Sequence, residues 1–200
     1  MTLKKVLKWT GLVILGLYVL LVIYRAFVLQ AEDTTEKQVA LIHSTRLSLV
    51  DVMGQRLPPD PGTAADATIA GVDGNENGIR DDVELAIFKE YPDSAKTRAV
   101  LLQYALALQM EVTQKIVNEG TVIAVAQDSG RAYQCVGEIV SRDNFDTFIA
   151  ITEGFHSFVE ERQWNTPARM TAHKEFYRGN LGSYSSLKET CDLDLNVLPN

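Results

Sequence analysis

The sequence has few of the residues and motifs from which an enzyme class can be read. It contains two cysteines and three histidines among 200 residues. It has no glycine-rich nucleotide loop, no zinc-protease helix motif, no nucleophile elbow and no Cys-x-x-Cys pair. Any catalytic site would have to assemble from residues far apart in the chain. One alternative function is therefore a hydrolase-like enzyme of the cell envelope with an acidic active site that the sequence does not reveal.

Basic residues are scarce beyond the N-terminal segment. Residues 1–30 contain Lys4, Lys5, Lys8 and Arg25 and no acidic residue, a charge of +4. The rest of the chain holds 19 − 4 = 15 basic and 26 acidic residues, a net charge of −11. Binding to nucleic acid phosphates requires a basic surface, so this distribution argues against a nucleic acid partner. An acidic surface favours solubility and attracts cations.

The N-terminal segment has the composition of a membrane anchor. No charged residue occurs from Trp9 to Tyr24, a run of sixteen residues. Such a run spans about 24 Å as a helix, against about 30 Å for a bilayer core. Lys8 and Arg25 flank the run and can extend their side chains to the interfaces. We therefore expect residues 1–30 to form a single-pass signal anchor.

Lysines precede the apolar run, whereas the acidic pair Glu32-Asp33 follows it. The positive-inside rule predicts a cytoplasmic N-terminus and a C-terminal body outside the inner or plasma membrane, in a bacterial cell the periplasm. A cleaved signal peptide is the competing interpretation. Cleavage after Ala26 or Ala31 would place Tyr24 or Leu29 where a small residue is required, which favours an uncleaved anchor. A buried helix of a soluble protein fits the lysine flank poorly.

The remaining sequence predicts an all-α fold, an N-terminal transmembrane helix followed by a bundle of five to six helices. The segment 121–126 is rich in β-branched residues and could be a strand, but its surroundings favour helix. Gly130 is expected to interrupt that helix, and Gly120 to stop the one before it. Pro58–Gly62 excludes regular structure, and the stretch through Gly71 is expected to be a loop that could act as a hinge between the stalk and the body. The expected helices cover residues 32–50, 81–91, 94–118, 121–142 with the interruption at Gly130, 145–162 and 166–179, with residues 94–118 enclosed at the centre.

These elements divide the chain into three parts. Residues 1–30 form the anchor, and residues 31–72 form a helical stalk with a proline- and glycine-rich loop. Residues 73–200 form a helical extracytoplasmic domain that opens with a metal-binding loop.

The run from Asp73 to Glu84, DGNENGIRDDVE, fits the calcium-loop pattern D-x-[DN]-x-[DN]-G-x5-E at every specified position. Calcium prefers six to eight oxygen ligands, and a tight loop presents side chains at alternate positions. Gly78 would allow the sharp turn. The expected Ca²⁺ ligands are the side chains of Asp73, Asn75, Asn77, Asp81 and Glu84 and the backbone carbonyl of Ile79.

These twelve residues resemble the calcium loops of thrombospondin type 3 repeats, within the wider EF-hand-like group. The resemblance implies the same six ligands, and it covers only about 6% of the chain. No amphipathic helix enters the loop, no second loop exists to pair with it, and Arg80 stands where an aliphatic residue is usual. These departures predict a structural or low-affinity site. The alternative is a turn in which Asp81 caps a helix and Glu84 reaches back in a capping box.

The two cysteines, Cys135 and Cys191, form an even count in a domain expected to lie outside the cytoplasm, which predicts a disulfide. The alternative is a buried, unpaired Cys135. Such a bridge would attach the acidic tail that begins at Asp192 to the bundle.

Other candidate residues are better explained as ordinary surface or core residues than as a catalytic or metal site. Glu153 and His156 have the Glu-x-x-His spacing of di-iron bundles, but neither His43 nor His173 has a glutamate three residues earlier. The pair Glu160-Glu161 fits a solvated helix face better than a hydrolytic pair, because adjacent helical residues diverge in direction. We therefore expect a calcium-binding helical domain displayed from a membrane, with a structural role or a protein partner in the envelope.

Overall fold

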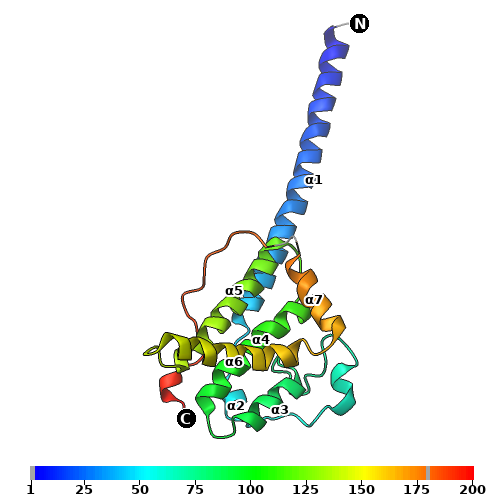
Figure 1. The fold of residues 1–200 in the computed structure, drawn as a ribbon. Coiled ribbons are helices and arrows are strands. Elements are labelled where there is room, and N and C mark those ends of the chain that lie inside the picture. The colour runs from blue at the N-terminus through cyan, green and yellow to red at the C-terminus, as the bar shows by residue number, and fades with distance from the viewer. Residues whose placement is uncertain (1–2, 179–180) are drawn as a thin grey trace.

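The computed structural model describes residues 3–178 and 181–200. One long helix, α1 (Leu3–Ser44), projects from a helical body, and the C-terminus lies at the end of the body far from the N-terminus (Figure 1). The apolar part of α1 has a mean hydropathy of 2.5, and none of it is buried inside the body. By length and composition, this is the one helix among the described residues that could cross a membrane.

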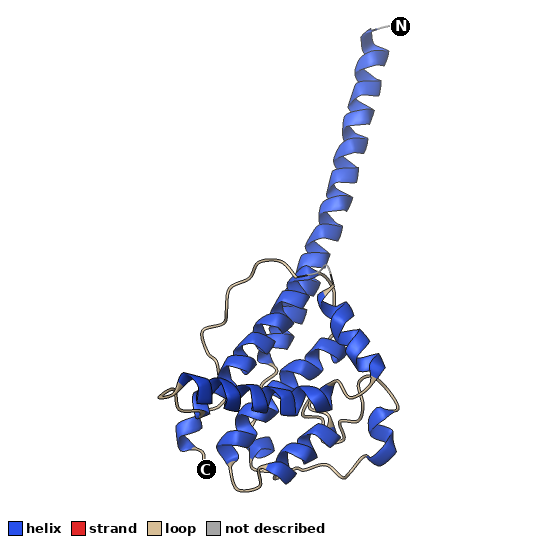
Figure 2. Ribbon diagram, viewed as in Figure 1, coloured by secondary structure: helices blue, strands red, loops and turns tan. Residues whose placement is uncertain are grey.

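Helices joined by loops form the body, and no strand occurs among the residues that the structure describes (Figure 2). The predicted all-α fold is therefore confirmed. Three short 3₁₀ helices lie at Gly62–Asp66, Gly137–Ile139 and Leu195–Val197. The α-helices of the body are α2 (Leu49–Val52), α3 (Asp81–Glu90), α4 (Ala95–Thr113), α5 (Glu119–Val136), α6 (Phe145–Gln163) and α7 (Pro167–Tyr177).

Helix α4 is the centre of the body, as its apolar residues on nearly every side predict. Fifteen of its 19 residues are buried, and it packs against α3, α5, α6 and α7. The core around it also includes Ile42 of α1, Val83 and Ile87 of α3, and Val159 of α6, all fully buried.

Capping residues fix the starts of three helices. The side chains of Ser94, Asn144 and Thr166 accept hydrogen bonds from the backbone amides three residues later, at the N-termini of α4, α6 and α7. Such caps satisfy amides that have no partner within the helix. Pro167 follows Thr166 at the first helical position, where a missing amide hydrogen costs nothing.

Several predicted helix ends are wrong. Helix α1 ends at Ser44, and α2 is a separate turn, so residues 32–50 are not one helix. Helix α4 ends at Thr113 and not near residue 118. Helix α5 begins at Glu119, after Asn118, whose backbone amide donates to the Thr121 hydroxyl. Gly120 therefore lies in the first turn of α5, and Gly130 lies inside that helix without interrupting it. The segment 121–126 is helical, as favoured. The predicted end of the last helix, Gly179, lies outside the described residues.

The end of α1 is part of the body. The Thr35 hydroxyl accepts a hydrogen bond of 2.6 Å from the side-chain amide of Asn118, Gln38 bonds Gln114 at 3.0 Å, and Ile42 is fully buried. The expected hinge region is also attached. The guanidinium of Arg169, fully buried, donates to the carbonyl oxygens of Ala65, Thr68 and Ile69.

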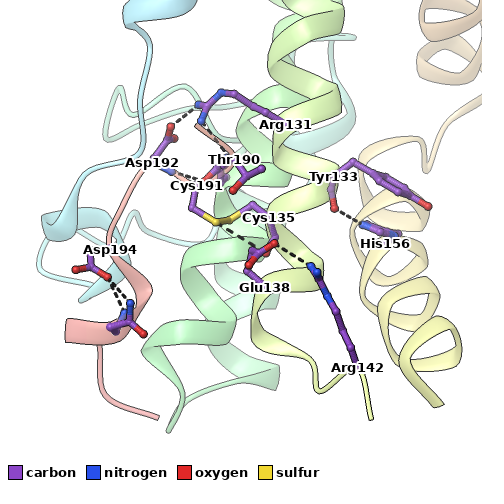
Figure 3. Close-up of a disulfide and its surroundings, with 12 residues drawn as sticks. Arg131, Tyr133, Cys135, Glu138, Arg142, His156, Thr190, Cys191, Asp192 and Asp194 are labelled. Carbon is purple, nitrogen blue, oxygen red and sulfur yellow. Dashed lines mark hydrogen bonds and ion pairs between the residues drawn. A yellow bond between two sulfur atoms is a disulfide. The ribbon is translucent and has the colours of Figure 1, made fainter. Parts of the chain in front are cut away.

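The predicted disulfide joins Cys135 of α5 to Cys191 of the C-terminal segment, 56 residues later (Figure 3). Beside it lies a cluster of buried charges, which we call the ionic network. Asp128 of α5 accepts from Arg131 at 2.6 Å, from Arg46 at 2.5 Å and from His43 at 2.9 Å. Arg131 also pairs with Asp192, whose other oxygen accepts from the backbone amide of Leu47. The network joins the end of α1, α5 and the tail.

Candidate metal-binding loop

The loop from Asp73 to Glu84 closes through backbone amides that point at its own carboxylate and amide oxygens. One carboxylate oxygen of Asp73 accepts from the amide of Asn77 at 3.1 Å, and the other accepts from Gly78 at 2.8 Å. The Asn77 side-chain oxygen accepts from Ile79 at 2.9 Å. These short-range bonds turn the first half of the loop around the Asp73 carboxylate.

Gly78 is required at its position for two reasons. Its φ of +84° lies in the left-handed region, which side chains disfavour. A Cβ atom there would also lie 2.7 Å from a methyl carbon of Leu106 in α4. The next residue, Ile79, is fully buried in the core. The second half of the loop therefore packs against the central helix α4.

Glu84 brings the two halves of the loop together. Its carboxylate accepts hydrogen bonds from the side-chain amides of Asn75 at 3.0 Å and Asn77 at 3.1 Å, and the residue is 1% exposed. The capping-box alternative predicts instead that Glu84 bonds the backbone at the helix start. The residue preceding α3 is Arg80, whose side chain makes no capping bond, and Asp81 is the first residue of α3, not its cap.

Asp81 points back into the loop. Both of its carboxylate oxygens accept from the amide of Gly74, at 2.9 and 3.1 Å, and its own amide bonds the Val72 carbonyl. The structure therefore brings the five predicted side-chain ligands and Ile79 into one closed loop, interlinked by hydrogen bonds. No ion pair with a lysine or arginine involves Asp73, Asp81 or Glu84 among the described residues.

Burial raises the pKa of Glu84 to about 7, and the nearby Asp51 and Asp81 carboxylates act in the same direction. Burial also raises the pKa of Asp81, helped by the charges of Asp73 and Asp82. Hydrogen bonds from Asn75, Asn77 and Gly74 oppose these shifts without cancelling them. Acidic groups are thus held in an environment that disfavours their negative charge.

Arg80 links the loop to α6. Its guanidinium is fully buried, pairs with Asp82 at 2.5 Å and donates to the carbonyl oxygens of Arg162 and Gln163 at 3.0 and 3.1 Å. Those carbonyls belong to the end of α6, where they have no partner within the helix. An arginine at this loop position therefore connects the loop to the bundle, where a paired EF-hand would contact a second loop.

Among residues 3–178 and 181–200, no group of three or more His, Cys, Asp or Glu side chains is arranged to hold a metal ion. The three acidic residues of the predicted set, Asp73, Asp81 and Glu84, are therefore not arranged as such a group in this structure. Comparison of the chain with protein-family models, with curated proteins and with solved structures finds no match.

Several polar residues outside the loop are buried or hydrogen-bonded in ways that the sequence did not predict. His43 bonds Asp128, and His173 bonds Glu111 at 2.5 Å. His156 is buried and stacks on Tyr133 with ring centroids 3.6 Å apart, so it is a core residue as expected. Glu160, expected on a solvated face, is half-buried and accepts from the Tyr104 hydroxyl at 2.5 Å, whereas Glu161 is exposed.

Proposed function

We propose that this protein is a membrane-anchored, extracytoplasmic helical domain that binds one calcium ion in the loop from Asp73 to Glu84. The ion would stabilise the body, which would have a structural role or bind a protein partner in the envelope. The observation that carries the proposal is the Glu84 carboxylate, which is buried near other acidic groups and, among the described residues, is bonded to two side-chain amides and to no basic group. Buried charge normally requires a counter-charge. A divalent cation would supply it.

The donor set suits calcium. Carboxylate, amide and carbonyl oxygens are the ligands of a hard cation, and a flexible set of six is within the number calcium takes. Asp73, Asp81 and Glu84 would supply the negative charge, and Asn75 and Asn77 would rotate their side-chain oxygens toward the ion. Because two ligands are neutral, the site should be weak, in the range of about 10⁻⁴ to 10⁻³ M found for extracellular modules.

The anchor and its orientation complete the proposal. The apolar part of α1 and the preceding lysines support a single span with the N-terminus in the cytoplasm. The disulfide supports an oxidising compartment for the body. Because α1 continues into the body without a break, the loop would sit on a domain held rigidly against its membrane helix.

Calcium should raise the melting temperature of the full chain in neutral detergent. At free calcium tenfold above the dissociation constant, linkage predicts about 1.4 kcal/mol of stabilisation. For a body of this size, that corresponds to roughly 3 to 6 °C. Melting with calcium and with chelator measures the difference. Asp73→Ala and Glu84→Ala should abolish it, whereas Glu76→Gln, an exposed loop position outside the ligand set, should retain it. Equal melting temperatures of the wild type in both conditions would refute the metal site.

Calcium affinity should depend on pH through Glu84. Since its pKa is raised to about 7, protons compete with calcium, and the apparent dissociation constant should fall about tenfold from pH 6 to pH 8. In the calcium-free protein, the raised pKa of Glu84 makes the free energy of unfolding larger at low pH. This contribution is fully present below about pH 4.5 and is lost as the pH rises through about 7. Isothermal titration calorimetry of wild type at both pH values measures the affinity.

Glu84→Gln is the matched variant, because it keeps the shape of the side chain and removes its charge. At pH 8 without calcium it should melt no lower than wild type, since it carries no buried charge, yet it should show no stabilisation by calcium. If Glu84 only capped a helix, the variant would be less stable and wild-type affinity would not depend on pH.

One observation favours the alternative, an envelope enzyme. Glu111 holds the ring of His173 beside a cavity between α4, α5 and α7. A histidine oriented by a carboxylate at a cavity is an arrangement used in acid–base catalysis. The residues around this cavity indicate which kind of ligand could bind there. They do not indicate which reaction an enzyme would catalyse.

A further inference from the structure

The cavity between α4, α5 and α7 has a volume of about 310 Å³. This is at the lower end of the range of about 300 to 1,000 Å³ typical of small-molecule sites. Four tyrosines contribute to its walls, and they come from different parts of the chain: Tyr104 of α4, Tyr133 of α5, Tyr177 of α7 and Tyr184 of the segment after α7. Its remaining polar lining includes Glu111, Ser129 and His173.

Glu111 is the acidic group of this cavity. Its side chain is 1% exposed, although it lies on the most apolar helix of the body. One carboxylate oxygen accepts from the hydroxyls of Ser129 at 3.1 Å and Tyr177 at 2.6 Å. The other accepts from His173 Nδ1 at 2.5 Å. Three donors thus hold a buried carboxylate in one orientation, and burying it brings no apolar packing in return.

A second carboxylate lies close by. Glu160 of α6 accepts from the Tyr104 hydroxyl, and its charge, like that of Glu111, helps to raise the pKa of His173. Burial and these neighbours raise the pKa values of Tyr104 and Tyr177, so both tyrosines keep their hydroxyl protons and remain donors. No lysine or arginine lines the cavity within the described part of the chain. Glu111 is therefore the one carboxylate in the described lining of the cavity, and Glu160 adds negative charge nearby.

Two of the aromatic rings are partly exposed, although one face of Tyr133 stacks on His156. Tyr133 is 49% and Tyr184 44% exposed. Tyr184 lies on a segment without helix that the side chain of Gln127 attaches to α5 through the Ser185 carbonyl. The faces of such rings attract cations, because their π-systems are negative. The net charge of −11 beyond residue 30 acts in the same direction over a longer range.

We propose that this cavity binds a small organic ammonium ion, with Glu111 supplying the negative charge and the rings of Tyr133 and Tyr184 contacting the cationic group. An anionic ligand would meet the Glu111 carboxylate, and no lysine or arginine of the described lining could pair with it, so it is disfavoured. A purely apolar ligand would gain nothing from the negative charge of Glu111. This site is separate from the calcium loop and does not depend on it.

The test uses the full chain in neutral detergent at alkaline pH, where His173 carries the least charge, with calcium and with chelator. Benzyltrimethylammonium is the cationic probe, and benzenesulfonate is its anionic counterpart of similar size. Calorimetry should detect the cation and show at least about fivefold weaker binding of the anion. No binding of the cation at 10 mM, or equal binding of both probes, would overturn the proposal.

Variants locate the site. Tyr184→Ala, on an exposed segment, should weaken cation binding about two- to fivefold. Glu111→Gln should weaken it at least about fivefold. Phe145→Ala removes a ring that is 72% exposed at the start of α6, outside the cavity, and should leave binding unchanged. If Glu111→Gln does not fold, Tyr184→Ala decides alone. Equal effects of Tyr184→Ala and Phe145→Ala would place the cation elsewhere and refute this assignment.

Discussion

Asp128→Asn is expected to lower the free energy of unfolding of the body by about 3 to 5 kcal/mol. The Asp128 side chain is 1% exposed, and it is the shared partner of Arg131, Arg46 and His43. Removing its charge leaves Arg131, itself 5% exposed, with Asp192 as its remaining acidic partner, which Arg46 also contacts. Breaking a buried ion pair is costly because the remaining charge cannot regain water.

Urea denaturation of the full chain in detergent, followed by the fluorescence of Trp164 in the body, measures this loss. The matched control is Glu138→Gln. It removes the pair between Glu138 and Arg142, whose side chains are 45% and 67% exposed, and should cost less than about 1 kcal/mol. If Asp128→Asn cost no more than the control, the ionic network would not stabilise the fold.

The network has a consequence for the proposed anchor. Asp128 bonds the last turn of α1 through His43, and Asp192 accepts from Leu47 just beyond that helix. The helix proposed to span the membrane is therefore held to the body by buried charges as well as by apolar packing. Asp128→Asn should loosen α1 from α5, so residues 35–44 should become more sensitive to proteolysis than in the Glu138→Gln control.

The sequence predicted the helical elements well where local signals act. Thr166-Pro167 marked the start of α7, and the apolar residues on every side of α4 marked its central position, because both depend on neighbours within a few residues. The predictions that Gly120 ends one helix and that Gly130 interrupts the next were wrong. A glycine inside a helix costs only about 1 kcal/mol, which the packing of α5 against α1 and α4 can outweigh.

The loop could be predicted in the same way, since all of its proposed ligands fall within twelve residues. The contacts that attach it to the body could not. Arg80 bonds carbonyls more than eighty residues later, and Arg169 bonds the segment a hundred residues earlier. One feature of the sequence could have indicated the role of Arg80. It is an arginine at a loop position where an aliphatic residue is usual.

The ammonium site depends on residues that sequence reasoning passed over. Glu111 stands in an apolar helix, and His173 has no metal-ligand spacing, so neither residue predicts the other. Only the packing of α4 against α7 brings them to 2.5 Å. The one acidic residue of the buried central helix, Glu111, is the feature that could have directed attention to this cavity.

Loss of the disulfide is expected to lower the free energy of unfolding by about 4 kcal/mol. The bridge between Cys135 and Cys191 closes a long loop, with a sequence separation of 56, and removing it restores the entropy of the unfolded chain. It also frees the segment whose Asp192 pairs with Arg131 and whose Thr190 carbonyl accepts from Gln103. Removing the disulfide should therefore weaken the ionic network as well as release the tail.

Urea denaturation of the Cys135→Ala/Cys191→Ala double variant measures the effect, and wild type in reductant should match it. A loss below about 1 kcal/mol in both would show that the tail is held without the bridge. The same bond tests the proposed location of the body, since disulfides persist in oxidising compartments. If the body lies in the periplasm, both cysteines should resist alkylation in intact cells until reductant is added. Free thiols in the unreduced, membrane-inserted chain would instead place the body on the cytoplasmic side and reverse the proposed orientation.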